Sequence, residues 1–123
     1  MNKRMDLNTA NPQFVDRVVE RFAALADETR IRLLLRLKVG EANVNTLTAD
    51  VGLTQASISK HLTTLRRVGI VDVRRQGVQA IYFIKDQTIF ELCKLVCDGV
   101  MRHVREEHAA IFAGEDNSTT QGV

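Results

Sequence analysis

Cysteine, proline and long apolar segments are scarce in this chain, and these shortages exclude several classes of protein. The two cysteines, Cys93 and Cys97, are too few and too close together for a disulfide framework, so we expect reduced thiols. The single proline, Pro12, and the lack of repeats argue against low-complexity linkers. No apolar segment approaches the roughly 20 residues that span a bilayer, and the first ten residues lack the apolar stretch of a signal peptide. We therefore expect a cytoplasmic protein that does not associate with a membrane.

The residue patterns on which enzymes depend are also missing. The sequence contains no glycine-rich phosphate-binding loop, no nucleophile paired with a base, and no pair of acidic residues suited to one wall of a site. We therefore expect a binding protein and not an enzyme.

The net charge is small, but the charges are unevenly distributed. A value of +2 would not by itself indicate a nucleic-acid partner. The segment from Thr54 to Arg75, however, contains five cationic residues and one acidic residue, so its net charge is +4 and that of the remaining chain is −2. A basic face confined to one segment is what binding to phosphates requires.

The length of 123 residues is that of one domain with a modest core. We place this domain at residues 11–113 and expect residues 1–10 and 114–123, which are polar and lack apolar periodicity, to be disordered. Asn11, Asp27 and Thr54 are capping residue types at the starts of three amphipathic segments. In the second of these helices we expect four buried aliphatic residues, namely Ile31, Leu34, Leu35 and Leu37.

The order of the remaining elements predicts the fold. A short helix over residues 44–51 ends at Gly52, and Gly69 ends the helix that Thr54 begins. The period then changes: residues 70–75 and 78–84 indicate two strands joined by a tight turn at 76–77, and a long helix follows from about residue 86 to 112. This order predicts an α+β fold, mainly α, which is a winged helix-turn-helix with five helices and a β-hairpin wing.

The helix that begins after Thr54 has the two faces expected of a helix that reads DNA. Apolar residues recur at helical spacing on its core side, whereas short polar and basic side chains, which fit a major groove ~12 Å wide, lie on the other side. Cations beside the hairpin turn can reach phosphates or a neighbouring minor groove. The predicted DNA-binding residues are Thr54, Gln55, Ser57, Ser59, Lys60, His61, Thr63, Arg67, Arg74, Arg75 and Gln79.

A winged-helix module that binds a protein in place of DNA is the alternative interpretation. Such a module would present an apolar or acidic face, whereas Lys60, Thr63 and Arg67 favour double-stranded DNA as the partner. Salt-dependent DNA binding would separate the two interpretations.

The last helix has more apolar surface than a small domain needs to cover itself, which predicts a homodimer. Its two apolar stripes are Ile89, Cys93, Val96, Val100 and Val104, and beside them Phe90, Cys97 and Met101. Cys93 and Cys97 lie on adjacent turns, and two interpretations of them stay open. Either both pack as small hydrophobic residues, or a soft metalloid such as arsenite, or an oxidant, modifies them as a thiol switch.

Three motifs give the chain a family resemblance. The sequences LADETRIRLL (Leu25–Leu34), SISKHL (Ser57–Leu62) and RRQG (Arg74–Gly77) resemble the ArsR/SmtB, or arsenical-repressor, family of winged-helix regulators. The resemblance covers about residues 15–104. It implies a homodimer whose first and last helices form the interface, which binds an inverted-repeat operator as a repressor and is released by an inducer.

Many members of that family sense metals, but this sequence lacks most of the ligands of their two metal sites. The family's third-helix site uses the cysteines of an E-L-C-V-C-D stretch, where residues 41–46 here are EANVNT. Its last-helix site needs one Asp and three His; Asp86 matches the first, but Thr88, Gly99 and Arg102 occupy the others. We therefore expect no metal site and no cofactor, with a metalloid or oxidant at the two thiols as the inducer to test.

Overall fold

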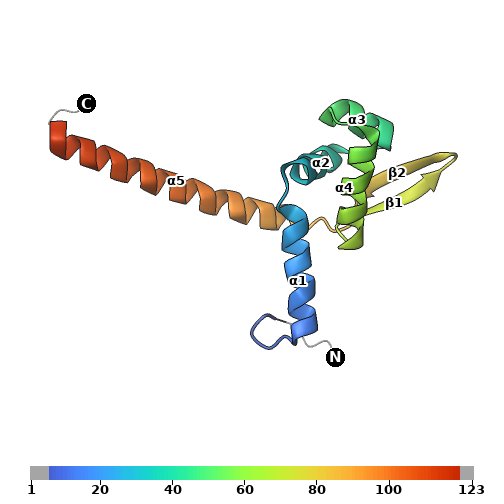
Figure 1. The fold of residues 1–123 in the computed structure, drawn as a ribbon, viewed down its shortest axis with the longest axis horizontal. Coiled ribbons are helices and arrows are strands. Elements are labelled where there is room, and N and C mark those ends of the chain that lie inside the picture. The colour runs from blue at the N-terminus through green and yellow to red at the C-terminus, as the bar shows by residue number, and fades with distance from the viewer. Residues whose placement is uncertain (1–5, 120–123) are drawn as a thin grey trace. The chain divides into compact units, whose positions relative to one another are not determined.

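The computed structural model describes residues 6–119 of the chain, with side chains as far as residue 113. It divides into two units, one that ends at Asp86 and one that begins at Gln87. Within the described residues there are five helices and one antiparallel sheet of two strands (Figure 1). The predicted composition of the fold, five helices and a hairpin, is therefore confirmed.

Side-chain caps define the starts of the four helices in the first unit. The elements of this unit are α1 (Pro12–Leu25), α2 (Glu28–Val39), α3 (Val44–Val51), α4 (Gln55–Arg67), β1 (Val71–Gln76) and β2 (Gln79–Ile84). Asn11, Asp27, Asn43 and Thr54 precede the four helices, and the side-chain oxygen of each accepts a hydrogen bond from a backbone N–H in the first turn. Each cap satisfies an amide that the helix itself leaves unpaired.

The core of the first unit is formed by α2, α3, α4 and the inner face of the hairpin. Eight of its side chains have essentially no exposed surface, and these are Leu33, Leu34, Leu47, Ile58, Leu62, Leu65, Ile70 and Val71. The expectation for α2 was partly wrong, because Leu33 is buried, whereas Leu35 is 54% exposed and Ile31 is only half-buried. Leu33, Leu34 and Leu37 follow the i, i+1, i+4 pattern of one helical face, and Leu35 is on another face.

The hairpin turn lies one residue later than the sequence predicted. Gln76 pairs with Gln79, so Gly77 and Val78 form the turn and β1 extends to Gln76. Gly77 has a φ of +63°, a conformation that two-residue hairpin turns require at this position and that glycine adopts without strain.

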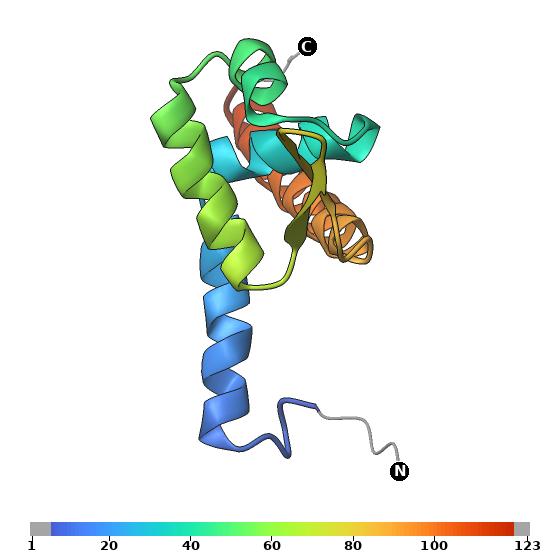
Figure 2. The same ribbon diagram turned by 90° about the vertical axis from the view of Figure 1, so that its right-hand side faces the viewer.

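The hairpin is joined to the helix-turn-helix by a short backbone pairing. Ala42, just before α3, exchanges two backbone hydrogen bonds with Tyr82 of β2, at 2.8 and 3.1 Å. Arg36 of α2 donates to Asp50 of α3 at 2.6 Å, which fixes these two helices at the surface. Figure 2 shows α4 and the hairpin beside each other, with α2 packed against both.

The second unit is a single long helix, α5 (Ile89–Thr119). The end expected at about residue 112 was too early, since a glycine at 114 costs a helix only about 1 kcal/mol and no proline follows it to stop the helix.

At the N-terminus of the chain, Asp6 accepts hydrogen bonds from the backbone N–H groups of Asn8 and Thr9. The disorder predicted for the two ends stays a prediction, and residues 1–5 and 120–123 lie outside the described residues.

Candidate nucleic-acid interface

One face of α4 is fully turned to solvent. Ala56, Lys60, Thr63 and Arg67 are all exposed, while Ile58, Leu62 and Leu65 on the opposite face have no exposed surface. Among the described residues, the charged ends of Lys60 and Arg67 have no hydrogen-bond or ion-pair partner. The predicted outward face of this helix is thus present and has two cations available to a ligand.

The other predicted residues of α4 flank this face or support it. Thr54 caps the helix through its hydroxyl oxygen, which accepts from Ser57 N at 3.2 Å. Gln55 is exposed in the first turn, and Ser57 and Ser59 are half-buried. The Thr63 hydroxyl donates to the carbonyl of Ser59 at 2.9 Å, so it faces a ligand as an acceptor.

His61 is turned away from the exposed face and toward the start of α2. Its side chain is 19% exposed, and its Nδ1 lies 3.2 Å from Nη1 of Arg30 and 3.8 Å from Oδ2 of Asp27. The structure therefore does not group His61 with the outward residues of α4. Contact between His61 and DNA stays a prediction, and the observed contacts connect the ring to Arg30 and Asp27 at the start of α2.

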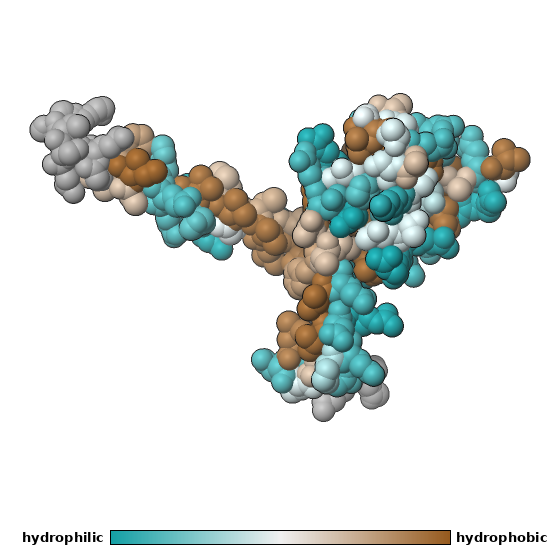
Figure 3. All heavy atoms as spheres, viewed as in Figure 1, coloured by the Kyte–Doolittle hydropathy of each residue, from teal (hydrophilic) through white to brown (hydrophobic). Residues whose placement is uncertain are grey.

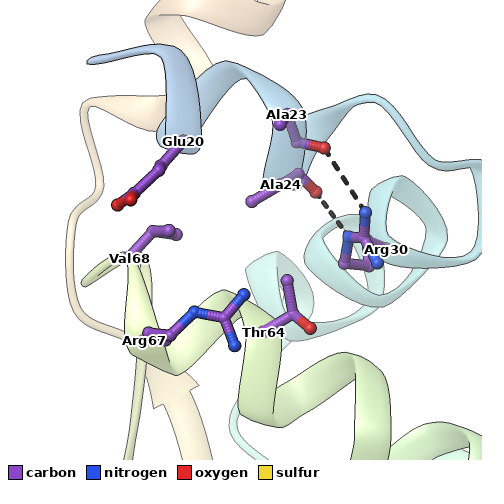
Figure 4. Close-up of a pocket in the computed structure, with 7 residues that line it drawn as sticks. All are labelled: Glu20, Ala23, Ala24, Arg30, Thr64, Arg67 and Val68. Carbon is purple, nitrogen blue, oxygen red and sulfur yellow. Dashed lines mark hydrogen bonds between the residues drawn. The ribbon is translucent and has the colours of Figure 1, made fainter. Parts of the chain in front are cut away.

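Arg30 joins three helices at this point. Its Nε donates to the carbonyl of Ala24 at 2.6 Å and its Nη2 to that of Ala23 at 3.3 Å, so it satisfies the last turn of α1 (Figure 4). Its Nη1 faces His61 of α4. The hydrogen bond from Arg30 N is the main reason that the pKa of Asp27 lies below its usual value. We had not singled out Arg30 from the sequence, because only the folded chain brings these carbonyls to it.

A shallow recess of about 360 Å³ lies beside Arg30, between α1, α2 and α4. Its rim includes Glu20 of α1 and Arg67 of α4, and Ala23, Ala24 and Val68 contribute apolar surface (Figure 4). The recess is wide open to solvent, so it defines no enclosed binding site.

The two arginines of the wing have different surroundings. Arg74 forms a two-pronged ion pair with the carboxylate of Glu41, with one of its bonds at 2.7 Å, and it also donates to Gln76. Arg75 is exposed and has no such partner among the described residues. The hydrogen bond from Arg74 lowers the pKa of Glu41. The stability that this pair contributes is therefore fully present above the usual pKa of a glutamate and is lost as the pH falls through the lowered pKa.

We expect the two arginines to contribute differently to DNA binding. Arg75→Ala should weaken binding to all sequences to a similar extent and lower the salt slope by about one unit, because it removes one available phosphate contact. Arg74→Ala should weaken binding further, because it also leaves the Glu41 carboxylate unpaired near the DNA. Adding Glu41→Ala to Arg74→Ala should then recover part of the loss. Equal losses in the two arginine variants, without recovery in the double variant, would contradict this assignment.

A second recess, of about 240 Å³, lies between the wing and the N-termini of α3 and α4. Two predicted DNA-binding residues, Gln55 and Gln79, line it, together with two asparagines outside that predicted set, Asn43 and Asn45. Asn43 Nδ2 donates to Gln79 Oε1 at 3.2 Å. The position of Asn43 directly before a predicted helix is the sequence signal for its capping role.

The second unit presents apolar residues along most of its length (Figure 3). Five of them have exposed fractions between 48% and 67%, and these are Leu95, Val96, Val100, Met101 and Val104. On α1, Val19 and Phe22 are 58% and 53% exposed. Both helices predicted to dimerise therefore carry uncovered apolar surface.

Cys97 is exposed on α5, Cys93 is half-buried, and the structure shows no disulfide between them. The described part of the chain contains no group of three or more His, Cys, Asp and Glu residues that could hold a metal ion. Nor does any helix in residues 6–119 have the length and apolarity to cross a membrane.

The helix-turn-helix formed by α3 and α4, followed by a basic hairpin, defines a winged helix-turn-helix protein. Residues 27–73 match the family model described as bacterial regulatory protein, arsR family. The chain is 38% identical over 94 residues to the uncharacterized HTH-type transcriptional regulator Rv0081 of Mycobacterium tuberculosis, an alignment that covers 76% of this chain and 82% of that protein. The chain belongs to the ArsR family of transcriptional regulators, as the resemblance predicted.

Two further comparisons support this assignment. KmtR, an HTH-type transcriptional regulator of M. tuberculosis, is 38% identical over 92 residues, which cover 75% of this chain and 66% of KmtR. The crystal structure of Rv0081 superposes with a TM-score of 0.69 at 32% identity, covering 80% of this chain and 98% of that one. The solution structure of Mb0332 from Mycobacterium bovis, described as a homodimeric winged helix-turn-helix DNA-binding domain, gives 0.68 at 27% identity, with coverage of 84% and 95%.

Proposed function

We propose that this regulator acts in the cytoplasm as a homodimer that binds an inverted-repeat DNA operator and represses transcription from it, by binding alone and without catalysis. The observation that carries the proposal is the outward face of α4, on which Lys60 and Arg67 are exposed without partners next to short polar side chains. Such a face matches the width and the hydrogen-bonding chemistry of a major groove. A module that binds protein would need an apolar or acidic face at this position.

The proposed dimer is supported by the apolar surface of α1 and α5. Exposed valine, leucine, methionine and phenylalanine side chains recur along both helices, and two copies of the chain would remove them from water. Mb0332, a structural relative, is described as homodimeric. A symmetric dimer places two copies of α4 against two half-sites about one helical turn apart, which requires an inverted repeat.

Substitutions in α4 test the DNA-binding role. Ser57→Ala and Lys60→Ala should each weaken binding to a duplex selected by the unmodified protein, by about 1–3 kcal/mol where a base contact is lost. Lys85→Ala removes the same charge at the end of β2 farthest from the hairpin turn, and we expect it to have a much smaller effect. Affinities are to be compared at one salt concentration, with folding checked by circular dichroism. Unchanged affinity in both α4 variants would refute the role of this helix.

We further propose that Cys93 and Cys97 form the switch that responds to the inducer. Cys97 is exposed, and a helical spacing of four places both sulfurs on neighbouring turns of the proposed dimer helix. The Cβ atoms of such neighbours are ~5–6 Å apart, whereas a disulfide needs ~3.8 Å, so a bridging metalloid or a bond across the dimer suits them better than a bond between them. A modification that favours one dimer geometry would shift the population away from the DNA-binding state.

Serine variants test the thiol switch. Arsenite, peroxide or polysulfide should release the unmodified protein from its selected duplex, and Cys93→Ser and Cys97→Ser should each abolish that response while still binding the duplex. The reason is that a hydroxyl neither binds a soft metalloid nor undergoes thiol oxidation. If both variants respond to an inducer as the unmodified protein does, the cysteines are packing residues and the signal enters elsewhere.

A further inference from the structure

The recess between the wing and the N-termini of α3 and α4 has a composition unlike the rest of the interface. Its lining residues are Asn43, Val44, Asn45, Gln55, Val78, Gln79 and Ala80, and none of them is charged. Four carboxamides and three apolar side chains therefore surround a space of about 240 Å³. We call this space the carboxamide groove. Phosphates are bound by cationic side chains, and the exposed cations Lys60 and Arg75 are not among the residues that line the groove.

The hydrogen bonds of the groove leave a defined set of donors and acceptors. Asn43 Oδ1 accepts from Thr46 N at 2.8 Å, so the amide nitrogen of Asn43 is the group that donates to Gln79 Oε1. This bond orients Gln79 and leaves its NH₂ as a donor. The carboxamides of Asn45 and Gln55 have no hydrogen-bond partner within the described residues, so each offers both a donor and an acceptor.

An apolar side chain stands at the edge of the same groove. Val78, in the hairpin turn, is 93% exposed, and Figure 3 shows the hydrophobic end of the hairpin. Two-residue turns favour glycine, asparagine or aspartate, so a β-branched residue here is neither favoured by the turn nor buried by the core. Its methyl groups are available to an apolar surface on a ligand.

We propose that the carboxamide groove reads an A·T base pair, with Asn45 and Gln55 as the residues that determine this specificity. In the major groove adenine offers an acceptor at N7 and a donor at N6, the pair of groups that one asparagine or glutamine carboxamide matches in bidentate fashion. Thymine adds a methyl group, which Val78 can contact. This inference rests on the proposed function, since it assumes that α4 and the wing engage DNA, and it extends the interface to the start of α3.

The experiment compares variants on a panel of duplexes. The parent duplex is selected from a randomised pool by the unmodified protein, and each base pair of one half-site is then replaced in turn. Asn45→Ala and Gln55→Ala should weaken binding to the parent duplex by about 5- to 150-fold. On the duplex whose contacted A·T pair has already been replaced, the same variant should show no further loss. The salt slope should stay that of the unmodified protein, because no charge is removed.

Two controls sharpen the test. Asn8→Ala removes an exposed carboxamide from the turn before α1, outside both proposed dimer helices, and should leave affinity and base preference unchanged. Replacing thymine by uracil at the contacted pair removes only the methyl group, which should weaken the unmodified protein by a fewfold and leave Val78→Ala unaffected. Three outcomes would overturn the role of the groove while leaving the proposed function intact. They are an equal loss of affinity on every duplex of the panel, a lower salt slope, and an unchanged preference for every A·T pair in both carboxamide variants. Failure of the unmodified protein to select any duplex would overturn the proposed function together with it.

Discussion

Val100→Glu should convert the protein to monomers and abolish tight operator binding. Val100 is 55% exposed on α5, and its neighbours along the helix, Val96 and Val104, are 55% and 48% exposed. Burying a carboxylate in an apolar interface without a partner costs several kcal/mol, and two-fold symmetry introduces the charge twice. Loss of the dimer separates the two recognition helices, so each half-site is then held by one copy alone and affinity should fall by at least 100-fold.

Sedimentation velocity at micromolar concentration and operator titration measure this prediction. Val39→Glu is the matched control, because Val39 is 85% exposed at the end of α2, outside both proposed dimer helices, and should tolerate the same change. The prediction fails if the unmodified protein already sediments as a monomer, or if Val100→Glu remains a dimer with unaltered operator affinity.

The local rules of capping and periodicity predicted most of the fold. Asn11, Asp27 and Thr54 each cap the helix expected of them, and α3 has the bounds that its flanking residues indicated. These features depend on residues within one or two turns, so they can be read along the chain. The errors occurred where the outcome depends on distant packing. Leu35 was expected in the core because it is apolar. The face of α2 that is turned to the core, however, is determined by the elements that pack against this helix.

The candidate site was predictable to the same extent. Helical spacing placed Lys60, Thr63 and Arg67 on one face, and the structure exposes all three. Spacing could not show that Arg74 is held by Glu41, 33 residues away, or that His61 turns inward toward Arg30. Such pairs are tertiary contacts between residues far apart in the sequence, and no local sequence pattern indicates them.

Arg30→Ala should be among the most destabilising substitutions outside the apolar core, by about 2–3 kcal/mol in the free energy of unfolding, because a charged donor to two backbone carbonyls is lost together with its contact to His61. The carbonyls of Ala23 and Ala24 would lose their partner at the end of α1, and His61 would lose the contact that ties α4 to α2. The position of α4 would then be less defined, so operator affinity should fall even where the variant is fully folded.

Arg32 provides the matched control for this prediction. It lies on the same helix, its side chain is 62% exposed, and its contact is an i, i+4 ion pair with Glu28. Exposed pairs of this kind contribute about 0.3–0.5 kcal/mol, so Arg32→Ala should barely change stability. Urea denaturation must be run at one protein concentration, since the stability of a dimer depends on concentration. Equal midpoints for the two variants would show that Arg30 is no more than a surface arginine. Arg30→Ala should also be compared in the unmodified protein and in a His61→Ala variant. A larger loss of stability when His61 is present would show that part of the effect comes from the contact between α2 and α4.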